Sequence, residues 1–148
     1  MPTLKELFTK QRAAVIDDCV VLLDAEVSSK SGLSGLAIKA GYSVVKGIKP
    51  TFIRDTLDRL MDEFADKLDP IYQEAKTANK PVAQAFVHNA ARAAEQLLQI
   101  TDGRAKKPGQ SGAVTKTYDK LRPSAKDHVM AAMPALGRLV EKYDEKGE

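Results

Sequence analysis

Two short segments of the chain combine the residue types that bind anions at a helix start. One reads Lys30-Ser31-Gly32-Leu33-Ser34-Gly35-Leu36-Ala37-Ile38-Lys39, and the other reads Lys107-Pro108-Gly109-Gln110-Ser111-Gly112-Ala113-Val114-Thr115-Lys116. Glycine lets an anion approach the backbone closely, the free amides of a first helical turn and a Ser hydroxyl donate hydrogen bonds to it, and Lys supplies positive charge. The candidate anion-binding residues are Lys30, Gly32, Ser34, Gly35, Lys39, Lys107, Gly109, Ser111, Gly112 and Lys116.

Two other interpretations of these segments remain open. The simpler one is a pair of ordinary Gly/Ser helix caps, which need no ligand, and an ancient internal duplication would also explain the likeness. Neither segment has the Gly-Lys-Ser/Thr ending of a Walker loop or the Gly-x-Gly-x-x-Gly of a dinucleotide site, and no predicted strand precedes either. If the segments bind an anion, the pattern indicates a phosphate-bearing partner but does not indicate which class of phosphate compound.

Positive charge is concentrated in two stretches that contain these segments. Residues 30–54 include five basic residues and no acidic one, and residues 103–126 include seven basic residues and one acidic one. The two stretches could form one positive face that attracts nucleic acid or an anionic membrane surface, or they could neutralise acidic helices within the fold. Because the chain has only four Tyr, four Phe and no Trp, we expect any nucleic acid to be bound through its backbone.

The chain lacks the residue arrangements of common catalytic and metal sites. It has one cysteine, Cys19, and two histidines, His88 and His128, which excludes Cys-rich zinc modules and disulfide scaffolds. No local Ser/His/Asp or Cys/His arrangement is present, so we expect no enzyme activity, no catalytic residue, no metal site and no cofactor. Cys19 is expected to be a buried core thiol.

A row of aspartates occupies one face of a predicted helix. Its members, spaced three or four residues apart, are Asp55, Asp58, Asp62, Asp66 and Asp69. Such a row could collect divalent cations, but no Glu-x-x-His motif accompanies it. We therefore interpret it as a solvated face, which could lie opposite one of the basic stretches.

Helical signals dominate the elements that must position these residues. Thr3 and Glu6 form a capping box that opens a helix reaching about Ser28. Further helices are predicted over 34–48, 51–68, 70–78, 81–101 and 111–121, and from 123 onward with a kink or split at Pro134. Asp69 is predicted to cap the helix that begins at Pro70. Residues 102–110 are predicted to be a flexible basic loop, and no run shows the alternation of a strand. The prediction is an all-α, compact single-domain bundle of six or seven helices over residues 1–148.

Two glycines lie inside the predicted helix over 34–48. Gly41 and Gly47 each lower helix stability by about 1 kcal/mol relative to alanine. We expect close crossing by another helix to offset that loss, and a hinge or a ligand contact is the alternative.

Three stretches of the sequence carry a family resemblance. Residues 31–50 read Ser-Gly-Leu-Ser-Gly-Leu-Ala-Ile-Lys-Ala-Gly-Tyr-Ser-Val-Val-Lys-Gly-Ile-Lys-Pro, and the shorter stretches are Leu68-Asp69-Pro70-Ile71-Tyr72 and Leu136-Gly137-Arg138-Leu139. They resemble small bacterial proteins catalogued as a domain of unknown function. The resemblance covers most of the chain from Ser31 onward and implies a bacterial, cytoplasmic, helical protein. It implies no activity, ligand or catalytic residue.

Residue usage also indicates the location and the class of function. A single cysteine fits a reducing compartment, and the first residues lack the basic-then-apolar run of a signal peptide, so we expect a cytoplasmic protein. We expect a non-catalytic helical binding or interaction protein that self-associates or binds a protein partner. The alternatives are phosphate or polyanion binding at the two basic helix starts, and a carrier that holds an apolar ligand between its helices.

Overall fold

The computed structural model describes residues 2–105 and 112–146 of the chain. Within those residues it contains eight helices and no strand. They are α1 (Leu4–Lys10), α2 (Arg12–Ser29), α3 (Gly32–Ile48), α4 (Phe52–Thr77), α5 (Val82–His88), α6 (Ala90–Ala105), α7 (Gly112–Ala131) and α8 (Met133–Lys146). The all-α prediction is confirmed, and the predicted number of six or seven helices is too low.

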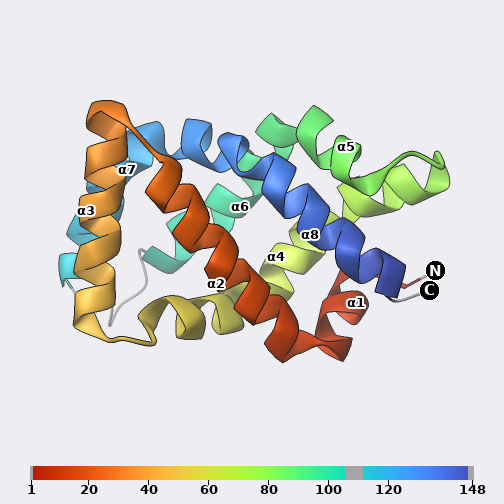
Figure 1. Ribbon diagram of the computed structural model, residues 1–148, viewed down its shortest axis with the longest axis horizontal. Helices are drawn as coiled ribbons and strands as arrows, with labels where there is room; N and C mark the ends of the chain where they lie inside the picture. Colours follow the sequence, from red (N-terminus) through yellow and green to blue (C-terminus); the bar gives the residue numbers. More distant parts are fainter. Residues whose placement is uncertain (1, 106–111, 147–148) are drawn as a thin grey trace.

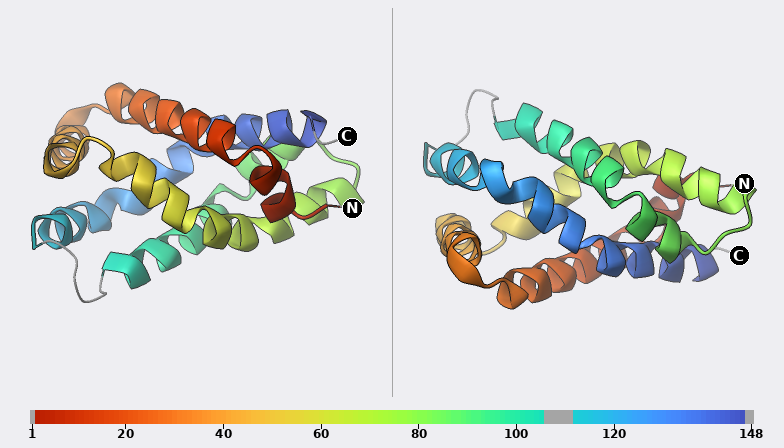
Figure 2. Two further views of the ribbon diagram at one scale, coloured as in Figure 1. Left: turned by 90° about the horizontal axis from the view of Figure 1, so that it is seen from below. Right: turned by 90° about the horizontal axis from the view of Figure 1, so that it is seen from above.

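The helices form an elongated bundle in which α3 stands across one end (Figure 1). Helices α2, α4 and α8 run obliquely along the long axis, and both termini lie at the end away from α3 (Figures 1 and 2). Helix α3 packs on α7, α6 packs on α7, and α5 packs on α8. None of the described helices is both long and apolar enough to span a bilayer.

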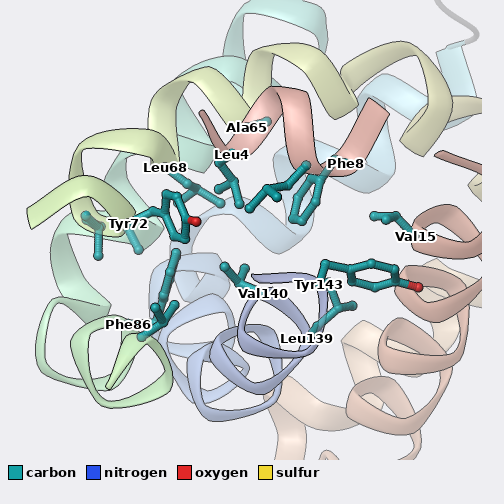
Figure 3. Close-up of a cluster of buried hydrophobic side chains, with 14 of the residues drawn as sticks. Leu4, Phe8, Val15, Ala65, Leu68, Tyr72, Phe86, Leu139, Val140 and Tyr143 are labelled. Atoms are coloured by element: carbon teal, nitrogen blue, oxygen red, sulfur yellow. The ribbon is translucent and has the colours of Figure 1, made fainter. Parts of the chain in front are cut away.

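The buried apolar cluster lies away from α3, where α1, α4, α5 and α8 meet. Figure 3 shows Tyr72 of α4, Phe86 of α5 and Val140 of α8 projecting into the same space, and all three are fully buried. Phe8 of α1 meets Tyr143 of α8 edge to face, with ring centroids 6.3 Å apart. This cluster is the hydrophobic core that drives folding.

The predicted helix from Thr3 to Ser28 is interrupted at Gln11. The Thr3 hydroxyl accepts a hydrogen bond from the Glu6 amide at 3.1 Å, as the capping box predicts. Gln11 has φ −131° and ψ 42°, which ends α1 before α2 begins. The break turns α1 onto α4, and neither Gly nor Pro marks it in the sequence.

Two prolines predicted to mark helix starts lie inside helices instead. Pro70 lies within α4, and Pro123 lies within α7. Around Pro70, the side chains of Leu68, Ile71 and Tyr72 are buried in the core. That burial outweighs the one backbone hydrogen bond that a proline removes, so the predicted boundary at Pro70 is wrong.

Asp69, predicted to cap a helix at Pro70, caps a different helix. Its Oδ1 accepts a hydrogen bond from the Leu4 amide at 2.8 Å and another from Gln73 Nε2 at 3.1 Å. Leu4 is the first residue of α1, so Asp69 satisfies one of the free amides at that helix start. A contact between residues 65 positions apart therefore fixes where α1 begins on α4.

The predicted helix over 81–101 is two helices. Asn89 separates α5 from α6 with φ −103° and ψ 27°, and its side-chain amide donates to the Ala85 carbonyl at 2.8 Å. Helix α6 continues to Ala105, so the first part of the predicted loop over 102–110 is helical. Residues 106–110 lie outside the described residues.

The split predicted at Pro134 is confirmed. Helix α7 ends at Ala131, and Pro134 is the second residue of α8. Proline at that position lacks only an amide that would have no intrahelical partner. The division at Ala132 therefore has little energetic penalty.

Candidate functional site

A pocket of about 530 Å³ lies between α3, α4, α6 and α7. Among the described residues of these helices, α7 has no fully buried one and α3 has only Gly35 and Gly41. On the α3 and α7 sides the space therefore lacks the large buried side chains that fill the core elsewhere, whereas Leu60 of α4 is buried. The main aliphatic side chains of its wall are Ile38, Val45, Ile53, Leu60, Val114 and Leu121.

Two facing helices present the same spacing to this pocket. The four positions on α3 are Ile38, Gly41, Tyr42 and Val45, and the four on α7 are Val114, Thr117, Tyr118 and Leu121. In each set the residues follow one another at i, i+3, i+4 and i+7, which places them on one side of the helix. These stripes can be read from the sequence, but periodicity does not distinguish a stripe that lines a pocket from one that fills a core.

The two tyrosines of the wall are held in the protonated form. Tyr42 donates a hydrogen bond to Asp24 Oδ1 at 2.5 Å, and burial followed by this bond raises the Tyr42 pKa. Burial and the bond to Asp102 raise the Tyr118 pKa to about 12. The Tyr118 hydroxyl also lies 2.8 Å from Thr101 Oγ1. Both rings therefore shape the wall, and their hydroxyls bind neighbouring helices.

Two arginines bring positive charge to the pocket wall. Arg104 of α6 forms an ion pair with Glu63. Arg59 of α4 is exposed at the solvent edge of the pocket. Asp55, one turn before Arg59 on α4, binds Lys49 Nζ at 2.8 Å. Neither arginine belongs to a sequence motif, so the sequence analysis missed both.

Gly41 marks the closest approach of α3 to α7. A Cβ at Gly41 would lie 2.8 Å from Leu121 Cδ1 and 2.9 Å from Thr117 Cγ2. The expected close crossing is therefore confirmed at Gly41. It is wrong at Gly47, where a Cβ would meet nothing within 4 Å.

The two basic helix starts lie at opposite ends of an antiparallel pair. Lys30, just before α3, has its Nζ 3.4 Å from the His128 carbonyl near the end of α7. Gly41, near the middle of α3, meets Leu121, near the middle of α7. At 1.5 Å per residue, the starts of α3 and α7 are about 25 Å apart. One small anion therefore cannot bind to both helix starts.

The first basic segment is largely engaged in local packing. The Lys30 side chain is only 11% exposed, and its Nζ also lies 3.5 Å from Glu26 Oε2. A Cβ at Gly35 would lie 2.8 Å from the Lys30 carbonyl carbon, and Gly32 has φ +73°. The positive φ favours glycine at position 32, and the close approach of the Lys30 backbone requires it at position 35. Ser34 and Lys39 are exposed.

The second basic segment is only partly described. Lys107, Gly109 and Ser111 lie outside the described residues, Gly112 begins α7, and Lys116 is exposed. Anion binding at either helix start stays a prediction.

The aspartate row of α4 faces solvent and also forms ion pairs with basic side chains of the first two helices, Lys5 of α1 and Arg12 of α2. Arg12 of α2 donates to Asp58 Oδ1 at 2.8 Å and to Asp62 Oδ1 at 3.0 Å. These hydrogen bonds to Asp58 and then Asp62 raise the Arg12 pKa. Within residues 2–105 and 112–146, no group of three or more His, Cys, Asp and Glu side chains is arranged to hold a metal ion.

Cys19 is partly buried beside the core. Burial, followed by the charge of Asp18, raises its thiol pKa to about 11. The thiol is therefore a poor nucleophile at neutral pH.

A family model described as "Family of unknown function (DUF6918)" matches residues 4–144. No curated protein and no solved structure matches the chain. The match includes every helix that lines the pocket and all the core residues, from Leu4 to Tyr143. The resemblance to a domain of unknown function is thus confirmed, and the chain belongs to the DUF6918 family.

Proposed function

We propose that this protein is a non-catalytic binding protein that holds a small apolar molecule with an anionic group between α3, α4, α6 and α7. The observation that carries the proposal is the pocket of about 530 Å³ with a mainly aliphatic wall. Sites for small molecules commonly have volumes of about 300 to 1,000 Å³ and combine apolar walls with a few polar groups.

The wall chemistry supports an amphipathic ligand. Apolar surface removed from water contributes about 25 cal/mol per Å², so the aliphatic stripes of α3 and α7 favour a hydrocarbon or aromatic body. Arg59 at the solvent edge and Arg104 within the wall favour a carboxylate, sulfonate or phosphate at one end of that body. The tyrosine hydroxyls are already hydrogen-bonded to neighbouring residues.

Native mass spectrometry of the protein purified from its own host is the first test. It reports bound mass and subunit number together. A discrete extra mass supports the proposal, and its value gives the class of ligand. A protein that is bare after gentle purification, and that also fails the titrations below, contradicts it.

Isothermal titration with decanoic acid and decanol separates the two parts of the proposed recognition. We expect decanoate to bind about tenfold more tightly than the alcohol, because a hydrogen-bonded charge contributes about 1.5 kcal/mol. Arg59→Gln should reduce that difference, because Arg104 remains, and leave decanol binding within about twofold, since the aliphatic side chains of the wall are unchanged.

A pocket-filling variant tests the location. Val45→Trp places a large ring in the pocket and should abolish binding of both probes. Val87→Trp is the matched control, because Val87 lies on α5, is 49% exposed and does not line the pocket. Equal binding by both variants would place the ligand elsewhere.

Phosphate or polyanion binding remains a second proposal, supported by the exposed side chains of Lys39 and Lys116. Lys39→Glu combined with Lys116→Glu should weaken binding to a polyanion at low salt. Unchanged affinity would contradict this second proposal without affecting the pocket.

A further inference from the structure

The side of α3 that faces away from the pocket is apolar and exposed. Leu33 is 88% exposed, Leu36 64%, Val44 46% and Ile48 43%. Together with exposed Ala40, these residues follow one another at spacings of three or four, so they share one side of the helix. We call Leu33, Leu36, Val44 and Ile48 the outer face of α3.

The outer face stands at the end of the molecule. Figure 1 shows α3 crossing the end of the bundle, and Figure 2 shows it nearly end-on at that same extremity. The exposure of its four aliphatic side chains shows that none of the described helices buries the outer face. Helix α3 shares this end of the molecule with the start of α7, and a partner that approaches the end does not first meet α2, α4 or α8.

The area of the outer face is small for a stable protein–protein interface. Helix α3 has 17 residues, so at 1.5 Å per residue one side of it presents a strip of about 25 by 10 Å. That is about a third of the roughly 800 Å² that each partner contributes to a stable interface. A second copy bound through this strip alone would dissociate easily.

The charge around the outer face also disfavours a second copy. Helix α3 contains exposed Lys39 and Lys46 and no acidic residue, and Lys46 Nζ lies 3.5 Å from Asp24 Oδ1 of α2. A two-fold contact through α3 would bring the same positive helix from each copy together. The surface of an anionic lipid bilayer instead fits both the small apolar strip and the positive charge. Lysines beside an apolar face reach the lipid headgroups, while the aliphatic side chains enter the acyl region.

We propose that the outer face of α3 docks the protein reversibly on the surface of an anionic lipid bilayer. Leu33, Leu36, Val44 and Ile48 insert below the headgroups, and Lys39 binds a lipid phosphate. The docking is peripheral, and it does not depend on what occupies the pocket on the opposite side of the same helix.

Vesicle flotation tests the proposal with the full chain. Wild-type protein should float with phosphatidylcholine vesicles that contain phosphatidylglycerol, and not with vesicles of phosphatidylcholine alone. Raising the salt to about 1 M, where the Debye length is about 3 Å, should reduce the bound fraction. Lys39→Gln should weaken binding about fivefold, the value of one lysine near an anionic surface.

The apolar part is tested by Leu33→Gln with Leu36→Gln. These exposed residues have no role in the core, so the variant should fold normally by circular dichroism and bind anionic vesicles at least tenfold more weakly. Val87→Gln is the matched control, since it removes another exposed aliphatic side chain, on α5, and should float like wild type.

Three results would overturn the proposal. The first is wild-type protein that fails to float with anionic vesicles at low salt. The second is flotation that the Leu33→Gln/Leu36→Gln variant retains in full. The third is a combination of two observations: wild-type protein does not bind vesicles, and it forms a concentration-dependent dimer in light scattering that the Leu33→Gln/Leu36→Gln variant does not form. In that case the occupant of the outer face is a second copy of the chain.

Discussion

Replacing Gly137 by alanine measures how closely α5 and α8 pack. A Cβ at Gly137 would lie 2.8 Å from the Ala83 carbonyl oxygen, 3.0 Å from the Ala83 Cα and 3.1 Å from the Phe86 Cβ. Backbone atoms cannot rotate away as the end of a side chain can. The two helices must therefore separate by about half an ångström to restore ordinary contact distances.

The size of the effect follows from two opposing contributions. Alanine in place of glycine favours a helix by about 1 kcal/mol. Overpacking a core by one methyl group costs about 1 to 3 kcal/mol, and rigid backbone neighbours place Gly137→Ala in the upper part of that range. We expect the free energy of unfolding to fall by about 1 to 2 kcal/mol. For a chain of this size the melting temperature should fall by about 2 to 8 °C.

Urea denaturation followed by circular dichroism gives this free energy directly. Gly47→Ala is the control, because a Cβ there meets nothing within 4 Å. It should be neutral or stabilise the protein by up to about 1 kcal/mol. If Gly137→Ala is as stable as wild type or more so, close packing is not what requires glycine at this position.

Three further predictions concern polar and reactive side chains. Hydrogen bonds from Lys142 and then Tyr143 hold the Asp18 pKa below its usual value, so the ionised carboxylate stabilises the folded protein. This stabilisation is present above about pH 4 and is lost as the pH falls through the folded-state pKa. Asp18→Asn should therefore flatten the acid limb of a curve of unfolding free energy against pH. Tyr72 donates to the buried Asp144 carboxylate at 2.5 Å, so Tyr72→Phe should lower the free energy of unfolding by about 1 to 3 kcal/mol in urea titration, and an unchanged value would show that the bond adds nothing. With its pKa near 11, Cys19 should react with iodoacetamide about a hundredfold more slowly at neutral pH than an ordinary cysteine, and rapid labelling of the folded protein would contradict its burial.

Local sequence signals predicted the helices well and several boundaries poorly. The cap at Thr3, the interval between α2 and α3 and the split at Pro134 follow from rules that involve only neighbouring residues. The break at Gln11 has no such signal, because it arises from the packing of α1 on α4. Pro70 carries a strong helix-start signal that tertiary burial overrides.

Asp69 shows why the candidate site was harder to predict than the fold. Its residue type favours helix capping, but the predicted cap at Pro70 is wrong, because the helix that Asp69 caps is α1, 65 residues away. The pocket poses the same difficulty. The apolar stripes on α3 and α7 have the same periodicity as helix faces that pack in a core. Whether the space between them is filled depends on the distances between α3, α4, α6 and α7, which periodicity does not give.

The uneven distribution of buried residues implies uneven resistance to local opening. The fully buried side chains gather where α1, α4, α5 and α8 meet, whereas no described residue of α7 is fully buried. Amides of α3 and α7 should therefore exchange their hydrogens with water through small excursions well below the free energy of global unfolding. Such local openings would separate α3 from α7 while the buried core stays packed. The same looseness that leaves a pocket between these helices thus also provides the route by which a molecule could enter it.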